Sequence, residues 1–319
     1  MSPLSTIFTL IALGALMNCS AFAEGLTFGL VGKSIDDANF IAAWRGCDTE
    51  AKRFGDKCIL VGGKGAADPR LQLQAIESAL KANRLAALAI SVTNSELIAK
   101  TVETAGVPIV TFDSPFSAKY EHLSLAYIGA DNVKFGHDLA KIAKRLRPQG
   151  GTVCLMTAYD PNLAQRVQGI RQELSGNSQF PEGQRLNGEG GWTEIARSPW
   201  NCGDSVERTI KELAVTLKHL KPDVFISVGQ WPVVDPAAYR KTVEPFRLEL
   251  IAKERIMIVA TGAIAPGQAA LLDEKLVHGY VSLSYREIGR RCYTLMRAAA
   301  EGKPIPLVTY TDNTIQIGE

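Results

Sequence analysis

The chain has 319 residues, of which 46% are hydrophobic and 21% are charged, and its formal net charge is +2. This is the composition of an ordinary globular protein with one large or two medium domains, and it excludes an intrinsically disordered chain. The small net charge and the lack of a long Lys/Arg run argue against a nucleic-acid partner.

The first two dozen residues have the pattern of a secretory leader. Residues 2–23 carry no charged side chain, hold an apolar core over residues 7–17 and end in Ala21-Phe-Ala23. This layout predicts a signal peptide, residues 1–23, cleaved before Glu24, and therefore a location in the periplasm. The segment before the apolar core lacks the usual Lys or Arg, so an uncleaved membrane anchor is the alternative.

The first apolar run after the leader ends in Gly-Lys-Ser at residues 32–34, which resembles part of a phosphate-binding loop. Such a loop needs a glycine five positions before the Gly-Lys, because its backbone N–H groups must surround the phosphates. Thr27 occupies that position. We therefore interpret the segment as a strand that runs into a ligand cleft, where Lys33 and Ser34 would be contacts.

The pattern after the leader alternates between strands and helices, which predicts an α/β fold with parallel sheets covered by helices. In the first half, strands are expected over 26–31, 58–61, 86–92 and 106–114, and helices over 36–54, 71–83 and 95–105. In the second half, strands are expected over 152–157, 184–186, 223–228, 256–261 and 277–283, and helices over 133–146, 162–175, 202–220, 236–252, 267–274 and 285–301. Two cycles of similar size indicate two similar lobes.

Ligands of open parallel sheets bind at the carboxyl ends of the strands, so the candidate residues are sought there. These ends and the helix starts beside them offer hydrogen-bonding and aromatic side chains: Lys33, Ser34, Asp37, Phe40, Asp113, Ser114, Arg166, Gln230, Trp231 and Thr261. They include no nucleophile–base couple, the histidines are solitary and no Cys-x-x-Cys occurs, so we expect neither an enzyme nor a metal or other cofactor. The set suits the binding of a polyhydroxylated molecule.

A sugar hydroxyl both donates and accepts hydrogen bonds, so a carboxylate and a guanidinium together can hold it. We expect Asp113 and Arg166, from opposite lobes, to clamp the hydroxyls, and Trp231 or Phe40 to stack on the sugar ring. Each has a structural alternative: Asp113 as a turn residue, Arg166 in a surface ion pair with Glu173, and Phe40 in the core.

Export to an oxidising compartment allows disulfides. Cys47, on a predicted helix, and Cys58, at the start of the next strand, are expected to form one. Cys154 and Cys202 are paired as a second bridge, which leaves Cys292 as a buried free thiol.

Six segments in order resemble the type I periplasmic solute-binding proteins of ribose-binding type. They are GLVGKSIDDANFIAAWRGCDTEAKRFG (29–55), GVPIVTFDS (106–114), YIGADNVKFGHDLAK (127–141), NLAQRVQGIRQEL (162–174), PDVFISVGQWP (222–232) and KLVHGYVSLSYREIGRR (275–291). The resemblance implies two Rossmann-like lobes, hinged by three crossing strands, that close over a small solute, usually a sugar, and deliver it to an ABC transporter. The expected N-terminal lobe is 24–128 plus 284–306, and the expected C-terminal lobe is 129–283 plus 307–319.

The same resemblance allows a second role, a monomeric periplasmic sensor that docks on a histidine kinase or chemoreceptor instead of a permease. The chain also departs from the family pattern. Gly229-Gln230-Trp231 stands where Asn-Asp is common, and no acid follows the next strand until Asp273. We therefore expect fewer charged contacts from the second lobe, and ribose itself is a doubtful ligand.

Overall fold

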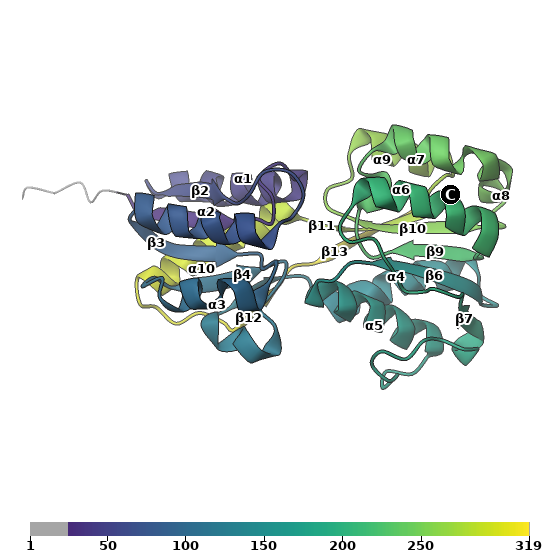
Figure 1. Cartoon of the computed structure of the whole chain (residues 1–319), viewed down its shortest axis with the longest axis horizontal. Coiled ribbons are helices and arrows are strands. Elements are labelled where there is room, and N and C mark those ends of the chain that lie inside the picture. Colours follow the sequence, from purple (N-terminus) through teal and green to yellow (C-terminus); the bar gives the residue numbers. More distant parts are fainter. Residues whose placement is uncertain (1–24, 319) are drawn as a thin grey trace, which may run out of the picture.

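A computed structural model of the chain describes residues 25–318, so the expected signal peptide lies outside the described residues. Figure 1 shows two lobes side by side, each with a central sheet covered by helices. The predicted α/β fold of two Rossmann-like lobes is confirmed. Within the described part of the chain, no helix is both long and apolar enough to cross a bilayer.

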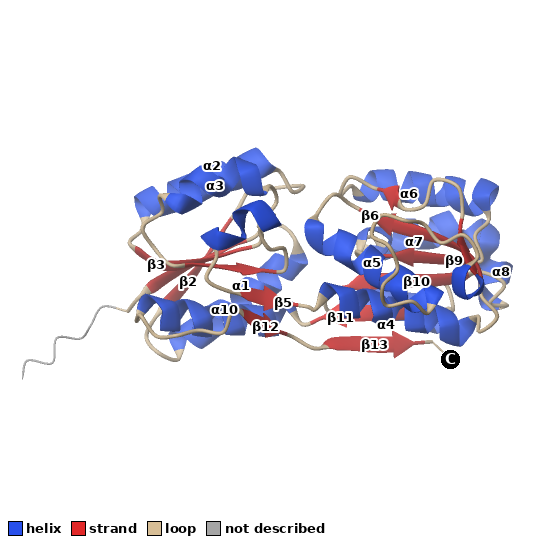
Figure 2. Cartoon of the chain, turned by 90° about the horizontal axis from the view of Figure 1, so that it is seen from below, coloured by secondary structure: helices blue, strands red, loops and turns tan. Residues whose placement is uncertain are grey.

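The first lobe has a six-stranded parallel sheet with the strand order β12-β5-β4-β3-β1-β2. Most of its strands are buried apolar runs, as expected where helices cover both faces. The strands are β1 (Thr27–Val31), β2 (Lys57–Val61), β3 (Leu85–Ile90), β4 (Ile109–Phe112), β5 (Tyr127–Gly129) and β12 (Val308–Tyr310). One face is covered by α2 (Pro69–Ala82) and α3 (Ser95–Glu103), the other by α1 (Ala38–Lys52) and α10 (Tyr285–Ala300) (Figure 2).

The second lobe has a sheet with the order β13-β11-β10-β9-β6-β7, in which β8 also pairs with β6 and only β13 is antiparallel to its neighbour. The strands are β6 (Gly151–Thr157), β7 (Trp192–Glu194), β8 (Trp200–Asn201), β9 (Val224–Ser227), β10 (Ile256–Thr261), β11 (Gly279–Leu283) and β13 (Asn313–Ile317). Its helices are α4 (Asn132–Leu146), α5 (Pro161–Ser175), α6 (Val206–Val215), α7 (Pro236–Val243), α8 (Arg247–Ile251) and α9 (Pro266–Asp273).

Helix starts follow local capping chemistry. The side chains of Asp37, Asp68, Asn94 and Asp131 each accept a hydrogen bond from a backbone N–H in the first turn of α1, α2, α3 and α4. An acceptor at this position satisfies an amide that has no partner within the helix. Each cap fixes the residue at which its helix begins after the preceding strand.

The chain passes between the two sheets three times, after β5, after β11 and between β12 and β13. Residues 307–319 are expected in the second lobe, but β12 pairs with β5 in the first sheet. The last crossing therefore follows Tyr310. Strand β12 is short and Val308 and Tyr310 are exposed, so its lobe is not evident from a hydrophobic pattern.

Three expected elements of the second lobe differ in the structure. The strand expected over 184–186 is absent, and Trp192–Glu194 pairs with β6 instead. The helix expected from residue 202 begins at Val206, because Ser205 provides its cap and the preceding residues form a turn. The helix expected over 236–252 is interrupted by a 3₁₀ turn at Glu244–Phe246, where Pro245 lacks the N–H that a continuous helix needs.

Of the two predicted disulfides, one is confirmed and one is wrong. Cys47 on α1 is bonded to Cys58 on β2, with their Cα atoms 5.9 Å apart, and Cys292 is a buried free thiol as expected. The predicted Cys154–Cys202 bridge is wrong, because both thiols are free and buried. The amide N–H of Cys202 donates to the carbonyl of Thr157, so Cys202 lies beside Thr157 on β6. Cys154 lies three residues from Thr157 along the same strand, roughly 10 Å away at the spacing of strand residues. This distance is too long for a disulfide bond between Cys154 and Cys202.

Candidate functional site: the interlobe cleft

A cavity of about 730 Å³ lies between the lobes, lined by residues that follow strands of both sheets. We call it the interlobe cleft. Nine of the ten predicted ligand residues line it: Lys33, Ser34, Asp37, Phe40, Asp113, Arg166, Gln230, Trp231 and Thr261. The tenth, Ser114, is completely buried and does not belong to the lining.

Asp113 follows β4 and is held firmly by its own lobe. Its backbone has a φ of 59°, a left-handed conformation that Asp tolerates better than most residues. One carboxylate oxygen accepts a hydrogen bond from the Ser91 hydroxyl at 2.9 Å, and the other accepts one from the Tyr285 hydroxyl, also at 2.9 Å. A carboxylate can accept about four hydrogen bonds, so Asp113 is oriented by these contacts and still has capacity for a ligand.

Lys33 follows β1 and connects the two lobes. Its ammonium donates to a carboxylate oxygen of Asp160, at the start of α5, over 2.7 Å, and lies 3.9 Å from Asp113. Burial lowers the pKa of Lys33, but the charges of Asp160 and Asp113 outweigh burial and raise this pKa above its ordinary value. Lys33 is therefore a charged, nearly buried group whose partners come from both lobes.

Asp37 and Phe40 lie at the start of α1. The Asp37 carboxylate accepts the N–H of Asn39 at 2.7 Å and so caps the helix. Burial raises the pKa of Asp37 and the nearby charge of Asp113 adds to this, against the lowering effect of the Asn39 hydrogen bond. The Phe40 ring packs edge-on against Phe112 and Tyr285, so Phe40 belongs to the core as well as to the cleft lining.

Arg166 lies one turn into α5 and is buried. Its guanidinium donates to the side chain of Asn132 at 3.0 Å and to the carbonyl of Val228 at 2.9 Å, and it lies over the ring of Phe135. The alternative of a surface ion pair with Glu173 is not observed, because Glu173 pairs with Lys144. Arg166 is thus a fixed cation at the wall of the cleft, with no carboxylate of its own.

The loop after β9 brings Gln230 and Trp231 to the cleft. The indole N–H of Trp231 donates to the carboxylate of Asp204 at 2.5 Å, and the ring packs tightly against Gly229. Burial raises the pKa of Asp204, while this hydrogen bond acts in the opposite direction. Trp231 is 7% exposed, so a ligand would meet part of a fixed ring.

Two side chains in the cleft lining carry buried polar atoms without a hydrogen-bond partner. They are the hydroxyl of Thr261, at the end of β10, and the amide oxygen of Asn162, in the first turn of α5. Thr261 is 5% exposed and Asn162 2% exposed. A buried polar atom without a partner is costly, so these two atoms are natural positions for the hydrogen-bonding groups of a ligand.

Four acidic or phenolic residues of the cleft were not among the predicted contacts, and one of them, Asp36, is exposed. Asp160 follows β6 and precedes Pro161 at the start of α5, a position that the strand-end rule could have found. Asp204 stands in an irregular turn and Tyr285 comes from the first lobe's last helix, so neither has a local signal. Beside Arg166, the second lobe places the carboxylates of Asp160 and Asp204 in the cleft lining, and both come from loops other than those after β9 and β10.

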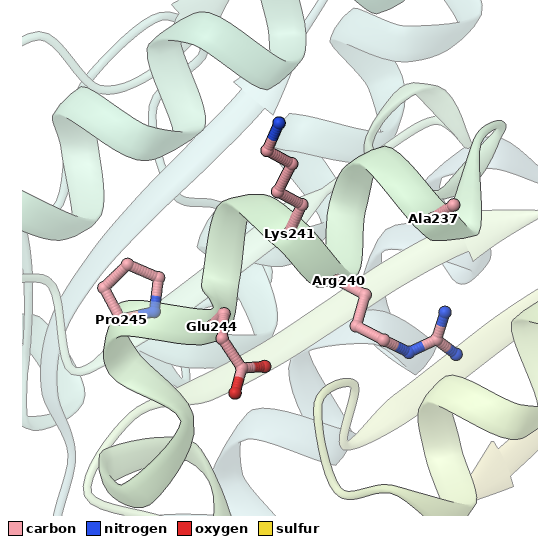
Figure 3. A pocket seen from close by; sticks show the side chains of 5 residues that line it. All are labelled: Ala237, Arg240, Lys241, Glu244 and Pro245. Carbon is pink, nitrogen blue, oxygen red and sulfur yellow. The ribbon is translucent and has the colours of Figure 1, made fainter.

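A second hollow lies on α7 and the turn after it, lined by Ala237, Arg240, Lys241, Glu244 and Pro245. Figure 3 shows Lys241 and Arg240 pointing away from each other there. The guanidinium of Arg240 is already paired with Glu274 at 2.7 Å, and the side chains of the hollow are largely exposed. This hollow lacks the buried, converging polar groups that the interlobe cleft has.

The model of the periplasmic binding protein domain family matches residues 28–304. No curated protein sequence matches the chain significantly. The family match covers both lobes and all the residues of the cleft described above.

Solved structures share the fold at low identity. A glucose-galactose binding protein, GanP, from Geobacillus stearothermophilus is 19% identical, with a TM-score of 0.74 over 92% of this chain and 98% of that one. An ABC transporter solute-binding protein from Agrobacterium vitis, bound to α-D-tagatopyranose, is 17% identical, with a TM-score of 0.76 over 92% and 94%. The XylFII–LytSN complex contains a chain 16% identical, with a TM-score of 0.71 over 92% and 98%. By the extent of the family match, the chain belongs to the periplasmic binding protein domain family.

Proposed function

We propose that the chain captures a sugar or a similar small polar solute between its lobes and delivers it to an ABC transporter in the membrane. The observation that carries this proposal is the interlobe cleft, where Asp113 of one lobe and Arg166 of the other lie in one cavity with two unpartnered polar groups. Similar structures from Geobacillus stearothermophilus and Agrobacterium vitis are described as sugar-binding or sugar-bound, which supports the same class of ligand.

Capture requires that the ligand favours the closed arrangement of the lobes over the open one. The lobes already touch at the Lys33–Asp160 ion pair and where Gly262 lies against the side chain of Asn39. A solute that bonds to both lobes adds contacts which exist only in the closed state. Between residues 25 and 318, three crossings connect the lobes, so rotation about them can open the cleft.

The proposal includes export through the leader, residues 1–23, to the periplasm. The Cys47–Cys58 disulfide supports this location, because such bonds persist mainly in oxidising compartments. The lining of the cleft supports binding rather than catalysis, since the Asp113 carboxylate and the Arg166 guanidinium are both held by hydrogen bonds to their own lobes.

A sensor that docks on a membrane receptor is the second candidate. It is favoured by one similar structure, in which XylFII forms a complex with LytSN. The transporter and the sensor would use the same cleft, so the binding experiment tests what both share.

The decisive experiment is a thermal-shift screen of the exported protein against sugars, polyols and their amino derivatives. A ligand that binds only the folded state stabilises it by about 2.7 kcal/mol at a concentration of 100 times its Kd. At least one compound should raise the melting temperature, and small-angle scattering should show a more compact protein with it. If no compound of the panel binds, the proposed function is wrong.

A further inference from the structure

The interlobe cleft contains more negative than positive charge. Two cationic side chains line it, Lys33 and Arg166, whereas five carboxylates do so: Asp36, Asp37, Asp113, Asp160 and Asp204. Asp36 is exposed at the rim and accepts the N–H of Gly65, but the other four are at least partly buried. Neutral sugars would leave this excess of negative charge uncompensated.

The two cations do not neutralise the excess. The ammonium of Lys33 is paired with Asp160 at 2.7 Å and lies 3.9 Å from Asp113. Arg166 gives its hydrogen bonds to Asn132 and Val228, both neutral groups. Asp37 and Asp204 therefore have no cationic partner within ion-pair distance in the described part of the chain. Burial raises the pKa of both carboxyls, and the charge of Lys33 lowers it too little to offset burial.

An independent observation points to a donor group in the ligand. The amide oxygen of Asn162 accepts hydrogen bonds only, and in the structure it receives none although it is buried in the lining of the cleft. The hydroxyl of Thr261 is similarly without a partner. Trp231 and Phe40 line the same cavity, and aromatic rings attract ammonium groups through their faces.

A bound metal ion is a poor candidate for the missing positive charge. Among residues 25–318, no group of three or more carboxylate, His or Cys side chains is arranged to hold a metal. A neutral polyol would displace the water that solvates the carboxylates and offer no compensating charge. A protonated amine supplies three N–H donors and the charge together.

We propose that the ligand of the interlobe cleft is a polyhydroxylated molecule that carries a protonated amine, such as an amino sugar, with the amine near Asp37 and Asp204 and the hydroxyls near Asp113 and Arg166. This inference rests on the proposed function and names its ligand class. It predicts that the amine contributes at least as much to affinity as the hydroxyls do.

The test uses matched pairs that differ only in the amine: glucose and glucosamine, galactose and galactosamine, mannose and mannosamine. Calorimetric titration of the exported protein at pH about 6, where an aliphatic amine is protonated, should give at least one pair in which the amine member binds about tenfold tighter or more. Replacement of Asp204 by Asn keeps the acceptor for Trp231 and suits the left-handed backbone at φ 59°. This variant should reduce the preference for the amine about tenfold.

The control is Asp273→Asn, the same chemical change at an exposed site outside the cleft, which should leave the preference unchanged. If the neutral member of a pair binds as tightly as its amine, or if Asp204→Asn keeps the preference, the inference is wrong while the capture of a polar solute stands. If no member of any pair binds, the inference fails, and the wider panel above then decides the proposed function separately.

Discussion

The two lobes repeat one framework but differ in how they are held and what they present to the cleft. In each lobe two helices approach so closely that only glycine fits between them, Gly46 and Gly289 where α1 meets α10, and Gly136 and Gly169 where α4 meets α5. Among the cysteines that the structure describes, a disulfide links helix to sheet in the first lobe and none does so in the second. The corresponding region of the second lobe contains free cysteines and an irregular segment around β7 and β8.

The two lobes also differ in the residues that they contribute to the cleft. In the first lobe Asp113 and Lys33 directly follow strands, and the Asp113 carboxylate is fixed by Ser91 and Tyr285. In the second lobe Asp204 and Trp231 come from longer loops and hold each other. The shared helix packing positions the strand ends, whereas the ligand class depends mainly on loops that the framework does not determine.

Replacement of a glycine in either helix pair tests the shared framework and should have the largest effect. A methyl group at Gly46 would overlap the carbonyl of Arg286, and one at Gly169 would overlap the carbonyl of Val133. Backbone must move in both cases, so Gly46→Ala and Gly169→Ala should each lower the free energy of unfolding by about 3 kcal/mol. Denaturant titration measures this loss.

Hydrogen exchange then shows where the protein opens, in the first lobe for Gly46→Ala and in the second for Gly169→Ala. The control is Arg45→Ala, an exposed change beside Gly46, which should alter stability by less than about 0.5 kcal/mol. Unchanged stability in both glycine variants would contradict the close packing of the helix pairs.

The disulfide tests the difference between the lobes. The Cys47–Cys58 bond closes a segment with a sequence separation of 11. A cross-link of this length lowers the entropy of the unfolded chain, which stabilises the folded protein by about 3 kcal/mol. Replacement of both cysteines by Ala should therefore destabilise the protein by about this amount, with faster hydrogen exchange confined to α1 and β2. The Cys292→Ala variant, which removes a free thiol, serves as the comparison.

The framework could be predicted from the sequence because it depends on local patterns. Buried strands such as Leu85–Ile90 and caps such as Asp131 carry their signal within a few residues. Strand β12 and the pairing of Cys202 depend on which distant segment lies beside them, and no short pattern records that.

The same distinction applies to the residues of the candidate site: some have a local sequence signal, and others are placed by distant contacts. Asp113 directly follows β4 and Arg166 lies one turn into the helix after β6, so the strand-end rule predicts both, whereas the place of Asp204 depends on the fold of a loop. Residues such as Asp204 could not be predicted, because their place in the site depends on contacts between segments that are distant in the sequence.

Arg166 tests the second lobe's share of ligand binding. Truncation to Ala removes a buried cation from the cleft wall and leaves the carbonyl of Val228 without this donor, so affinity should fall about a hundredfold. Arg166→Lys keeps the charge but not the planar donor geometry and should retain part of the affinity. Calorimetry with the compound identified by the screen measures both, and circular dichroism checks that they fold. Full affinity in Arg166→Ala would remove Arg166 from the site.

The smallest expected effect compares one buried carboxylate from each lobe in the absence of ligand. Burial raises the pKa of Asp37 and of Asp204 above the ordinary value of 3.8, so each carboxylate destabilises the folded protein at neutral pH. This destabilisation is relieved as pH falls through the raised pKa.

Asp37→Asn keeps the helix cap and Asp204→Asn keeps the acceptor for Trp231. Each variant should therefore melt a few degrees higher than the original protein at pH about 7, and the gain should be clearly smaller at pH about 4, because the carboxyl protonates as pH falls through its raised pKa. Asp273→Asn, exposed, should show no such trend between the two pH values. A gain that persists at low pH would show that these carboxylates are not destabilised by their burial in the cleft.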